Sequence, residues 1–249
     1  MLKQKESHSG IYLLPNLLTT ASLFAAFYSM VASAKGLFEP AVIAIFIGMV
    51  ADGLDGRIAR LTNTQTAFGA EYDSLSDMVT FGVAPSLLLY SWSLDQLGKI
   101  GWLVAFMYTA AVALRLARFN VQIDIVDKKY FQGLACPAGA AIVSSFVWFC
   151  EQNTWNNYYI ISLTTAVLAL VIAVLMISNL RYYSFKEIDF KGKVPFLYIL
   201  IIIVLFVAIA AAPSFVLFFG FLGYALSGPF YAVLSYKRRE RNIGNEEDK

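Results

Sequence analysis

Histidine is almost absent from this chain of 249 residues. The only one, His8, lies in a polar N-terminal tail. Hydrolases that pair serine with histidine, and enzymes that carry phosphate on histidine, need an imidazole beside the reacting group, because that ring takes up the proton or the transferred group. Because His8 is the single histidine and lies in the polar tail, outside the apolar blocks, neither kind of mechanism has a usable imidazole.

Charged residues and cysteines are also scarce. Charged residues make up 14% of the chain and hydrophobic residues 59%, whereas soluble domains carry about 25% charged residues. The two cysteines, Cys136 and Cys150, fall in or beside one apolar block, where packing is expected rather than a disulfide. Because the apolar excess comes in repeated blocks, the composition indicates an integral membrane protein.

The apolar blocks have the length of membrane spans. A helix needs about 20 apolar residues to cross a hydrocarbon core of ~30 Å, and helices satisfy their own backbone groups in lipid. The blocks predict an all-α polytopic bundle of about eight transmembrane helices. They cover residues 11–34, 39–61, 69–92, 100–121, 133–150, 158–179, 194–212 and 213–236. We expect one domain over residues 1–249, to which the last two blocks, 194–236, are an addition.

The basic residues indicate the orientation. With eight spans, all but two of the 19 Lys and Arg residues fall on the side of the N-terminus, and only Lys35 and Lys99 fall on the other. Lys and Arg concentrate in cytoplasmic loops. We therefore expect both termini in the cytoplasm and the chain in the cell membrane.

Two pairs of acids stand out between the second and third blocks. Asp52 and Asp55 are three residues apart, and Asp73 and Asp77 are four apart, so each pair shares one face of a helix. A short connection would bring the two faces together on the cytoplasmic side. Because ionised carboxylates in an apolar setting need a positive partner, the stretch predicts a site for divalent metal ions.

The residues between these acids complete a longer pattern. The spacing in full is Asp52-x2-Asp55-Gly56-x2-Ala59-Arg60-x8-Gly69-x3-Asp73-x3-Asp77. It resembles the signature of the CDP-alcohol phosphotransferase family, with every fixed position filled. The resemblance implies that Asp52, Asp55 and Asp73 bind metal, that Asp77 is a ligand and the general base, and that Mg²⁺ or Mn²⁺ occupies a two-metal site.

The other motif positions suit a nucleotide diphosphate. Glycine inside a helix costs about 1 kcal/mol relative to alanine, and small side chains let a ligand lie against the helix backbone. Arg60 can pair with a phosphate through two parallel hydrogen bonds. By resemblance, Gly56, Ala59, Arg60 and Gly69 hold the CDP group, and Asn16 and Thr19 of the first span contact the nucleotide.

Three further segments indicate which alcohol is the acceptor. Residues 74–85, 114–120 and 176–186 are similar to segments typical of phosphatidylserine synthases, as is Pro15-Asn-Leu-Leu-Thr19. The resemblance implies transfer of a phosphatidyl group from CDP-diacylglycerol to L-serine, in a homodimer with its active site facing the cytoplasm. Arg115 and Arg118 are three residues apart and could receive the serine carboxylate or a phosphate. We expect no nucleic-acid partner.

Two alternatives use the same acids. A synthase that acts on glycerol 3-phosphate or inositol phosphate would keep the aspartates and add basic residues around the site. A cation-coupled transporter would show an inverted repeat or acids near the membrane midplane. The sequence has no such repeat, and its acids lie toward one face.

Overall fold

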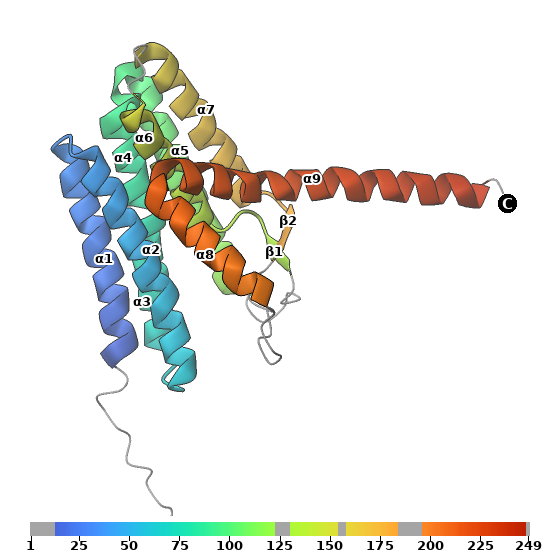
Figure 1. Ribbon diagram of the computed structural model, residues 1–249, viewed down its shortest axis with the longest axis horizontal. Coiled ribbons are helices and arrows are strands. Elements are labelled where there is room, and N and C mark those ends of the chain that lie inside the picture. The colour runs from blue at the N-terminus through green and yellow to red at the C-terminus, as the bar shows by residue number, and fades with distance from the viewer. Residues whose placement is uncertain (1–12, 123–129, 154–157, 184–195, 248–249) are drawn as a thin grey trace, which may run out of the picture.

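The computed structural model describes residues 13–122, 130–153, 158–183 and 196–247. Helices dominate it, and a single short antiparallel strand pair lies among them (Figure 1). In chain order the elements are α1 (Leu13–Ala34), α2 (Phe38–Leu61), α3 (Ala67–Asp77), the π-helix η1 (Met78–Val83), α4 (Ala84–Trp92), the 3₁₀-helix η2 (Leu94–Leu97), α5 (Lys99–Gln122), β1 (Tyr130–Gln132), α6 (Cys136–Gln152), α7 (Tyr158–Ile177), β2 (Arg181–Tyr183), α8 (Phe196–Ala211) and α9 (Pro213–Glu247).

A helix stands at each of the apolar blocks of the sequence. The predicted ends agree to within a few residues, except that α6 begins at Cys136 rather than at 133 and α9 continues to Glu247 rather than to 236. His8 and the block ends at residues 11–12 and 194–195 lie outside the described residues.

Within the described residues, four helices are long and apolar enough to cross a membrane: α1, α5, α7 and α9 up to Ala232. The fold is thus compatible with a membrane bundle, and the number of spans stays a prediction. Acids and arginines interrupt the apolar run of α2, and α8 has only 16 residues. The exposed large side chains of α8 from Leu200 to Val207 are all apolar, as expected for a helix that faces lipid.

The block at 69–92 is continuous but not uniformly α-helical. Directly after Asp77 the chain forms the six-residue π-helix η1 before α4 begins. Two contacts hold this wider turn: the Tyr108 hydroxyl donates to the carbonyl of Phe81 at 3.2 Å, and the hydroxyls of Ser22 and Thr80 lie 3.2 Å apart. Such π-turns are rare and often occur at functional sites.

Small residues allow α2 to pack closely against α1 and η1. The two helices run side by side (Figure 1) after a turn in which Gly36 takes a φ of +72°, a conformation that favours glycine. At Gly48 a Cβ would lie 3.0 Å from the Thr80 side chain and 3.3 Å from the Ser22 carbonyl. Close helix contact through small residues is the usual way that helices pack in membranes, and here it holds α2 where its aspartates face α3.

The strand pair was not predicted. β1 and β2 are antiparallel, with Gln132 opposite Arg181. Each strand has three residues, too few for an alternating pattern to show, and their partners are far apart in the sequence. The prediction of an all-helical fold is confirmed apart from this short strand pair.

Helix α9 packs antiparallel to α6 and ties the strand pair to the bundle. At one end the Ser214 hydroxyl donates to Oε1 of Gln152 at 2.6 Å, and at the other the Tyr182 hydroxyl donates to the Ala225 carbonyl at 3.0 Å. A Cβ on Gly228 would overlap the Tyr182 ring, so glycine is required there. Beyond this contact α9 continues away from the other helices (Figure 1).

Candidate metal and nucleotide site

The two aspartate pairs meet where α2 and α3 lie against each other. A short connection joins the helices, with Asn63 at φ +52° after the end of α2 and the Thr66 side chain accepting from the Gly69 N–H at the start of α3. One carboxylate oxygen from each of Asp52, Asp55 and Asp73 lies within 4.8 Å of the other two. These three acids could hold a metal ion.

Asp77 lies one helical turn beyond Asp73, about 6 Å along the axis, and its carboxyl faces that of Asp52. The structure does not place it in the group of three. Oδ1 of Asp77 and Oδ1 of Asp73 are both buried, and neither has a hydrogen-bond partner within the described part of the chain. Buried carboxylate oxygens without donors are costly. A hard divalent cation bound through oxygen removes this cost, so the residues present fit a metal centre.

Thr19 holds Asp55 in place. Its hydroxyl oxygen lies 2.6 Å from Oδ2 of Asp55 and 3.1 Å from the Pro15 carbonyl, and the Thr19 carbonyl accepts from the Ser76 hydroxyl at 3.2 Å. This one residue of α1 therefore bonds to both helices that carry the acids. The sequence suggested Thr19 only as a nucleotide contact. No local pattern marks a bond between residues 36 positions apart.

A cavity of about 410 Å³ opens beside the acids. All six residues that the resemblance assigns to the CDP group line it, together with two of the aspartates. Its lining consists of Pro15, Asn16, Thr19, Asp55, Gly56, Ala59, Arg60, Thr64, Gln65, Thr66, Gly69, Ala70 and Asp73. The residues that sequence reasoning missed are Pro15, Ala70 and the connection Thr64–Thr66, although most of them fall in the unspecified gap between the two acid pairs.

The glycines of the cavity keep space open. A Cβ on Gly56 would meet nothing closer than a guanidinium nitrogen of Arg60 at 3.9 Å, so helix packing does not require glycine there. A Cβ on Gly69 would lie 3.1 Å from Oγ1 of Thr66 and 3.4 Å from Oδ1 of Asn16. Gly56 therefore leaves a bare strip of backbone facing the cavity, and Gly69 lets Asn16 approach α3.

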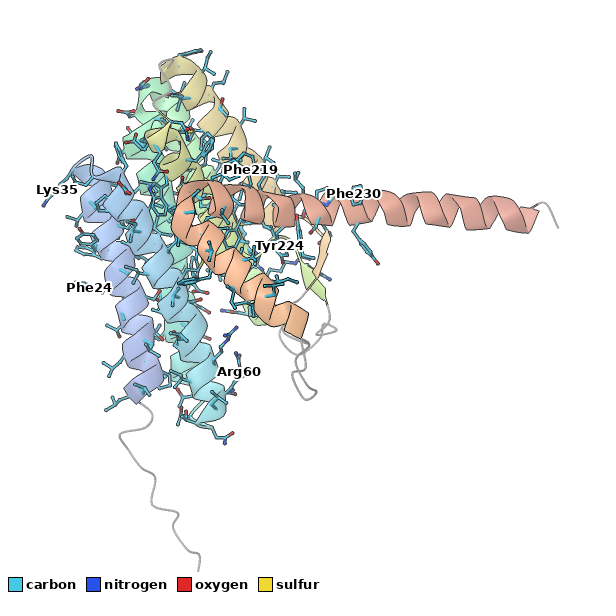
Figure 2. The ribbon with its side chains drawn as sticks, in the orientation of Figure 1. Phe24, Lys35, Arg60, Phe219, Tyr224 and Phe230 are labelled. Atoms are coloured by element: carbon cyan, nitrogen blue, oxygen red, sulfur yellow. The ribbon has the colours of Figure 1, made fainter. Side chains whose placement is uncertain are left out.

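Arg60 and Lys35 mark opposite ends of the α1–α2 pair (Figure 2). Arg60 is exposed at the last turn of α2 and borders the cavity, while Lys35 lies in the turn at the other end. The cavity and the acids are therefore at the end of the bundle that carries Arg60.

The two arginines of α5 have different surroundings. Arg118 donates to the Ile177 carbonyl at 3.2 Å, to Oδ1 of Asn179 at 2.6 Å and to Gln132, so it joins α5 to the end of α7 and to β1. Arg115 donates to Sγ of Cys136 at 3.2 Å, and its buried Nε has no partner in the described residues. Arg115 therefore keeps a donor for a ligand, while the guanidinium of Arg118 is engaged by the protein.

The three segments that narrowed the acceptor come together in space. Ser74 and Asn120 share hydrogen bonds between α3 and α5, and Arg118 bonds to Asn179 between α5 and the end of α7. Cys136, at the start of α6, accepts from Arg115 of α5, so these two helices meet beside the same segments. A second group of polar residues thus lies on the α5–α6 side of the acids, away from the cavity.

The sequence matches known proteins over most of its length. Residues 12–227 match the family model described as CDP-alcohol phosphatidyltransferase, and the chain belongs to that family. It is 39% identical over 199 residues to the CDP-diacylglycerol–serine O-phosphatidyltransferase of Helicobacter pylori J99, covering 78% of this chain and 81% of the relative. It is 38% identical over 194 residues to the protein of the same name from Methanocaldococcus jannaschii, covering 78% and 83%.

An archaetidylserine synthase from Methanothermobacter thermautotrophicus is 34% identical over 184 residues, covering 73% of this chain and 74% of the relative. The resemblance drawn from the aspartate spacing is therefore confirmed, and these relatives are named for serine as the acceptor.

Proposed function

We propose that the chain transfers the phosphatidyl group of CDP-diacylglycerol to the hydroxyl of L-serine and releases phosphatidylserine and CMP. The observation that carries the proposal is the joint placement of Asp52, Asp55 and Asp73 at the edge of a cavity lined by Gly56 and Gly69. Family membership and the names of the relatives agree with it.

The aspartates are assigned to Mg²⁺ or Mn²⁺. Asp52, Asp55 and Asp73 would hold the ion, with Asp77 completing a two-metal site, and Thr19 keeps the Asp55 carboxylate aimed at it. Bound divalent ions supply charge neutralisation for the pyrophosphate and its leaving group. The four negative charges of the carboxylates also balance the four positive charges of two such ions.

The nucleotide would lie along the small residues of α2 and α3. Gly56, Ala59 and Gly69 let its phosphates approach the helix backbones, and Arg60 and Asn16 offer donors at the rim. Thr19 lines the same cavity, but we assign its hydroxyl to Asp55.

In the reaction, the serine hydroxyl oxygen forms a bond to the phosphorus that carries the diacylglycerol. The bond from that phosphorus to the bridging pyrophosphate oxygen breaks, and CMP leaves. Asp77, buried beside Asp52, takes the hydroxyl proton. No group of the protein becomes covalently bound to the phosphatidyl group in this direct displacement.

Serine would approach from the α5–α6 side. Arg115 has a buried Nε without a partner and is the donor that we assign to the serine carboxylate. Arg118, the other candidate, is bound to Asn179 and Ile177 and would act by holding the end of α7 in place.

We further propose that the chain is one domain with eight spans and both termini in the cytoplasm, with the site facing the cytoplasm, and that it works as a homodimer in the cell membrane. The end of the bundle that carries Arg60 would then meet soluble serine, and the donor lipid would enter sideways from the bilayer.

The most direct test of the proposal compares several acceptor alcohols; we call this set the acceptor panel. Purified protein with CDP-diacylglycerol and Mg²⁺ or Mn²⁺ is given serine, glycerol 3-phosphate, inositol phosphate or inositol, and CMP release and radiolabelled lipid are measured. Of these four acceptors, we expect only serine to support turnover. Turnover with a phosphorylated acceptor and none with serine would replace the proposed acceptor, while no CMP release with any acceptor would refute the reaction type.

A further inference from the structure

A second cavity, of about 500 Å³, forms an apolar groove along α2. Residues of α2 from Ile43 to Leu54 form one wall, and side chains of α1, α6, α8 and α9 complete it. None of its lining residues is charged. Water in a cavity needs polar partners, so the lining is suited to hydrocarbon.

The groove begins beside the nucleotide cavity. Leu18 and Leu54 line the groove, and the next residue of each helix, Thr19 or Asp55, lines the nucleotide cavity. The two cavities thus border the same contact between α1 and α2. A ligand with its phosphates at the aspartates would have its apolar portion at Leu18 and Leu54.

The length of the groove matches one leaflet of a bilayer. From Leu54 to Ile43 the helix rises about 16 Å at 1.5 Å per residue. Half of a ~30 Å hydrocarbon core is about 15 Å. An acyl chain that starts at the level of Leu54 would therefore end near Ile43.

At the far end of the groove, hydrogen bonds hold the lining in place. The indole nitrogen of Trp148, a lining residue, donates to Oε1 of Glu39 at 3.1 Å, and Glu39 lies one helical turn before Ile43. Ile209 lies in the last turn of α8 and Pro213 begins α9, and α9 is held to α6 by the bond between Ser214 and Gln152. The groove thus adjoins the nucleotide cavity at Leu54 and has anchored side chains about one leaflet away.

We propose that this groove binds one acyl chain of the liponucleotide, and that Trp148 with the α8–α9 turn limits the length of the chain it accepts. The proposal rests on the proposed function for the identity of the headgroup. It gives α8 and α9, which carry none of the motif, a part in choosing the donor lipid.

The test compares donors of different chain length. CMP release is measured with dioctanoyl, dimyristoyl and dioleoyl CDP-glycerol, using whichever acceptor of the panel supports turnover. Val50→Trp narrows the middle of the groove, and Ile209→Trp adds bulk to the lining at the end of α8. The matched controls are Val174→Trp on α7 and Ile203→Trp on α8, since both lie exposed outside the groove.

We expect Val50→Trp to lower the ratio of kcat/KM for the dioleoyl donor to that for the dioctanoyl donor by about tenfold, the effect of roughly two displaced methylenes. Ile209→Trp should move the preferred donor to a shorter chain, and the controls should leave the ratio within about twofold of the unmodified chain. An unchanged ratio in Val50→Trp, or an equal change in Val174→Trp, would overturn the proposal.

Photolabelling gives a readout that does not need turnover. CDP-diacylglycerol with a diazirine at the end of one acyl chain should label Trp148 and residues 209–217 of the unmodified protein, and unlabelled CDP-diacylglycerol should compete. Competition by phosphatidylcholine alone would mean that bulk lipid fills the groove, and cross-links to a second copy would mean that a dimer covers it. Either result overturns the acyl-chain assignment and leaves the acceptor panel unaffected.

Discussion

The hydroxyl oxygen of Thr19 lies 2.6 Å from Oδ2 of Asp55, so a residue of the first helix orients an acid of the second. Asp55 is 4% exposed and is the most buried of the three converging carboxylates. A buried carboxylate with a fixed donor keeps one oxygen occupied and presents the other to a ligand.

Replacing Thr19 by valine removes this donor and keeps the shape of the side chain. We expect the Mg²⁺ concentration for half-maximal CMP release to rise about 10- to 100-fold, as is usual when a residue that orients a metal ligand is lost. Thr19→Ser should stay close to the unmodified protein. Thr20→Val is the matched control, because Thr20 bonds to the Asn16 carbonyl and the Tyr72 hydroxyl and does not contact the acids. An unchanged Mg²⁺ requirement in Thr19→Val would show that Thr19 has no such role.

Asp77→Asn tests the proton acceptor. Asparagine fills the same space but cannot take up the serine proton, so kcat should fall by about 10²- to 10⁴-fold. The thermal midpoint should not fall, because Oδ1 of Asp77 has no protein donor to lose in the described structure. The control is Asp95→Asn in η2, an exposed acid near the turn that precedes α5. Normal turnover in Asp77→Asn would rule out Asp77 as both base and essential ligand.

Metal removal should act on stability as well as on activity. A chelator should abolish CMP release, and added Mg²⁺ or Mn²⁺ should restore it and raise the thermal midpoint, because an ion that binds only the folded state stabilises it. Asp52→Asn should lose this rise, while Glu71→Gln, which changes an exposed acid of α3, should keep it. If the midpoint rises equally in both variants, the ion binds elsewhere.

Gly56→Leu should block the nucleotide without disturbing the fold. The open space around Gly56 accommodates a side chain, and replacing glycine inside a helix gains up to about 1 kcal/mol. The added side chain would project toward the CDP cavity, so KM for CDP-diacylglycerol should rise at least about tenfold, with KM for serine little changed. Gly53→Leu is the matched control, since Gly53 is on the same helix, also has open space and does not line the cavity. Equal KM values in the two variants would contradict the nucleotide assignment.

Replacing the two arginines of α5 should have different effects, one on KM for serine and the other on stability. Arg115→Gln should raise KM for serine by about tenfold or more, the cost of losing a charged hydrogen bond, with KM for CDP-diacylglycerol unchanged. Arg118→Gln should chiefly lower the thermal midpoint, because its bonds to Ile177 and Asn179 join α5 to α7. A rise in KM for serine from Arg118→Gln alone, at an unchanged midpoint, would reverse the two roles.

The convergence of the acids could be predicted because it depends on local spacing. Asp52 and Asp55, like Asp73 and Asp77, share a helix face by periodicity alone, and the connection between the pairs is too short to let the faces diverge. The helices could be predicted for a similar reason. An apolar run long enough to cross a membrane must satisfy its own backbone hydrogen bonds, which a helix does.

Features that depend on distant partners could not be predicted. The strand pair joins residues around 131 to residues around 182, and η1 depends on contacts from Ser22 and Tyr108. Arg115 and Arg118 look equivalent in the sequence, three positions apart on one helix. Only their neighbours on α6, α7 and β1 show that the guanidinium of Arg118 is already engaged.

The sequence by itself thus determines where the helices form, which family the chain belongs to and which four acids form the site. Each of these follows from residue types at spacings of a few positions. Packing between helices determines which oxygen Thr19 holds, which arginine is left with a donor, and where an apolar groove joins the nucleotide cavity. These depend on side chains tens of residues apart being brought within a few ångströms, and no short-range pattern encodes that.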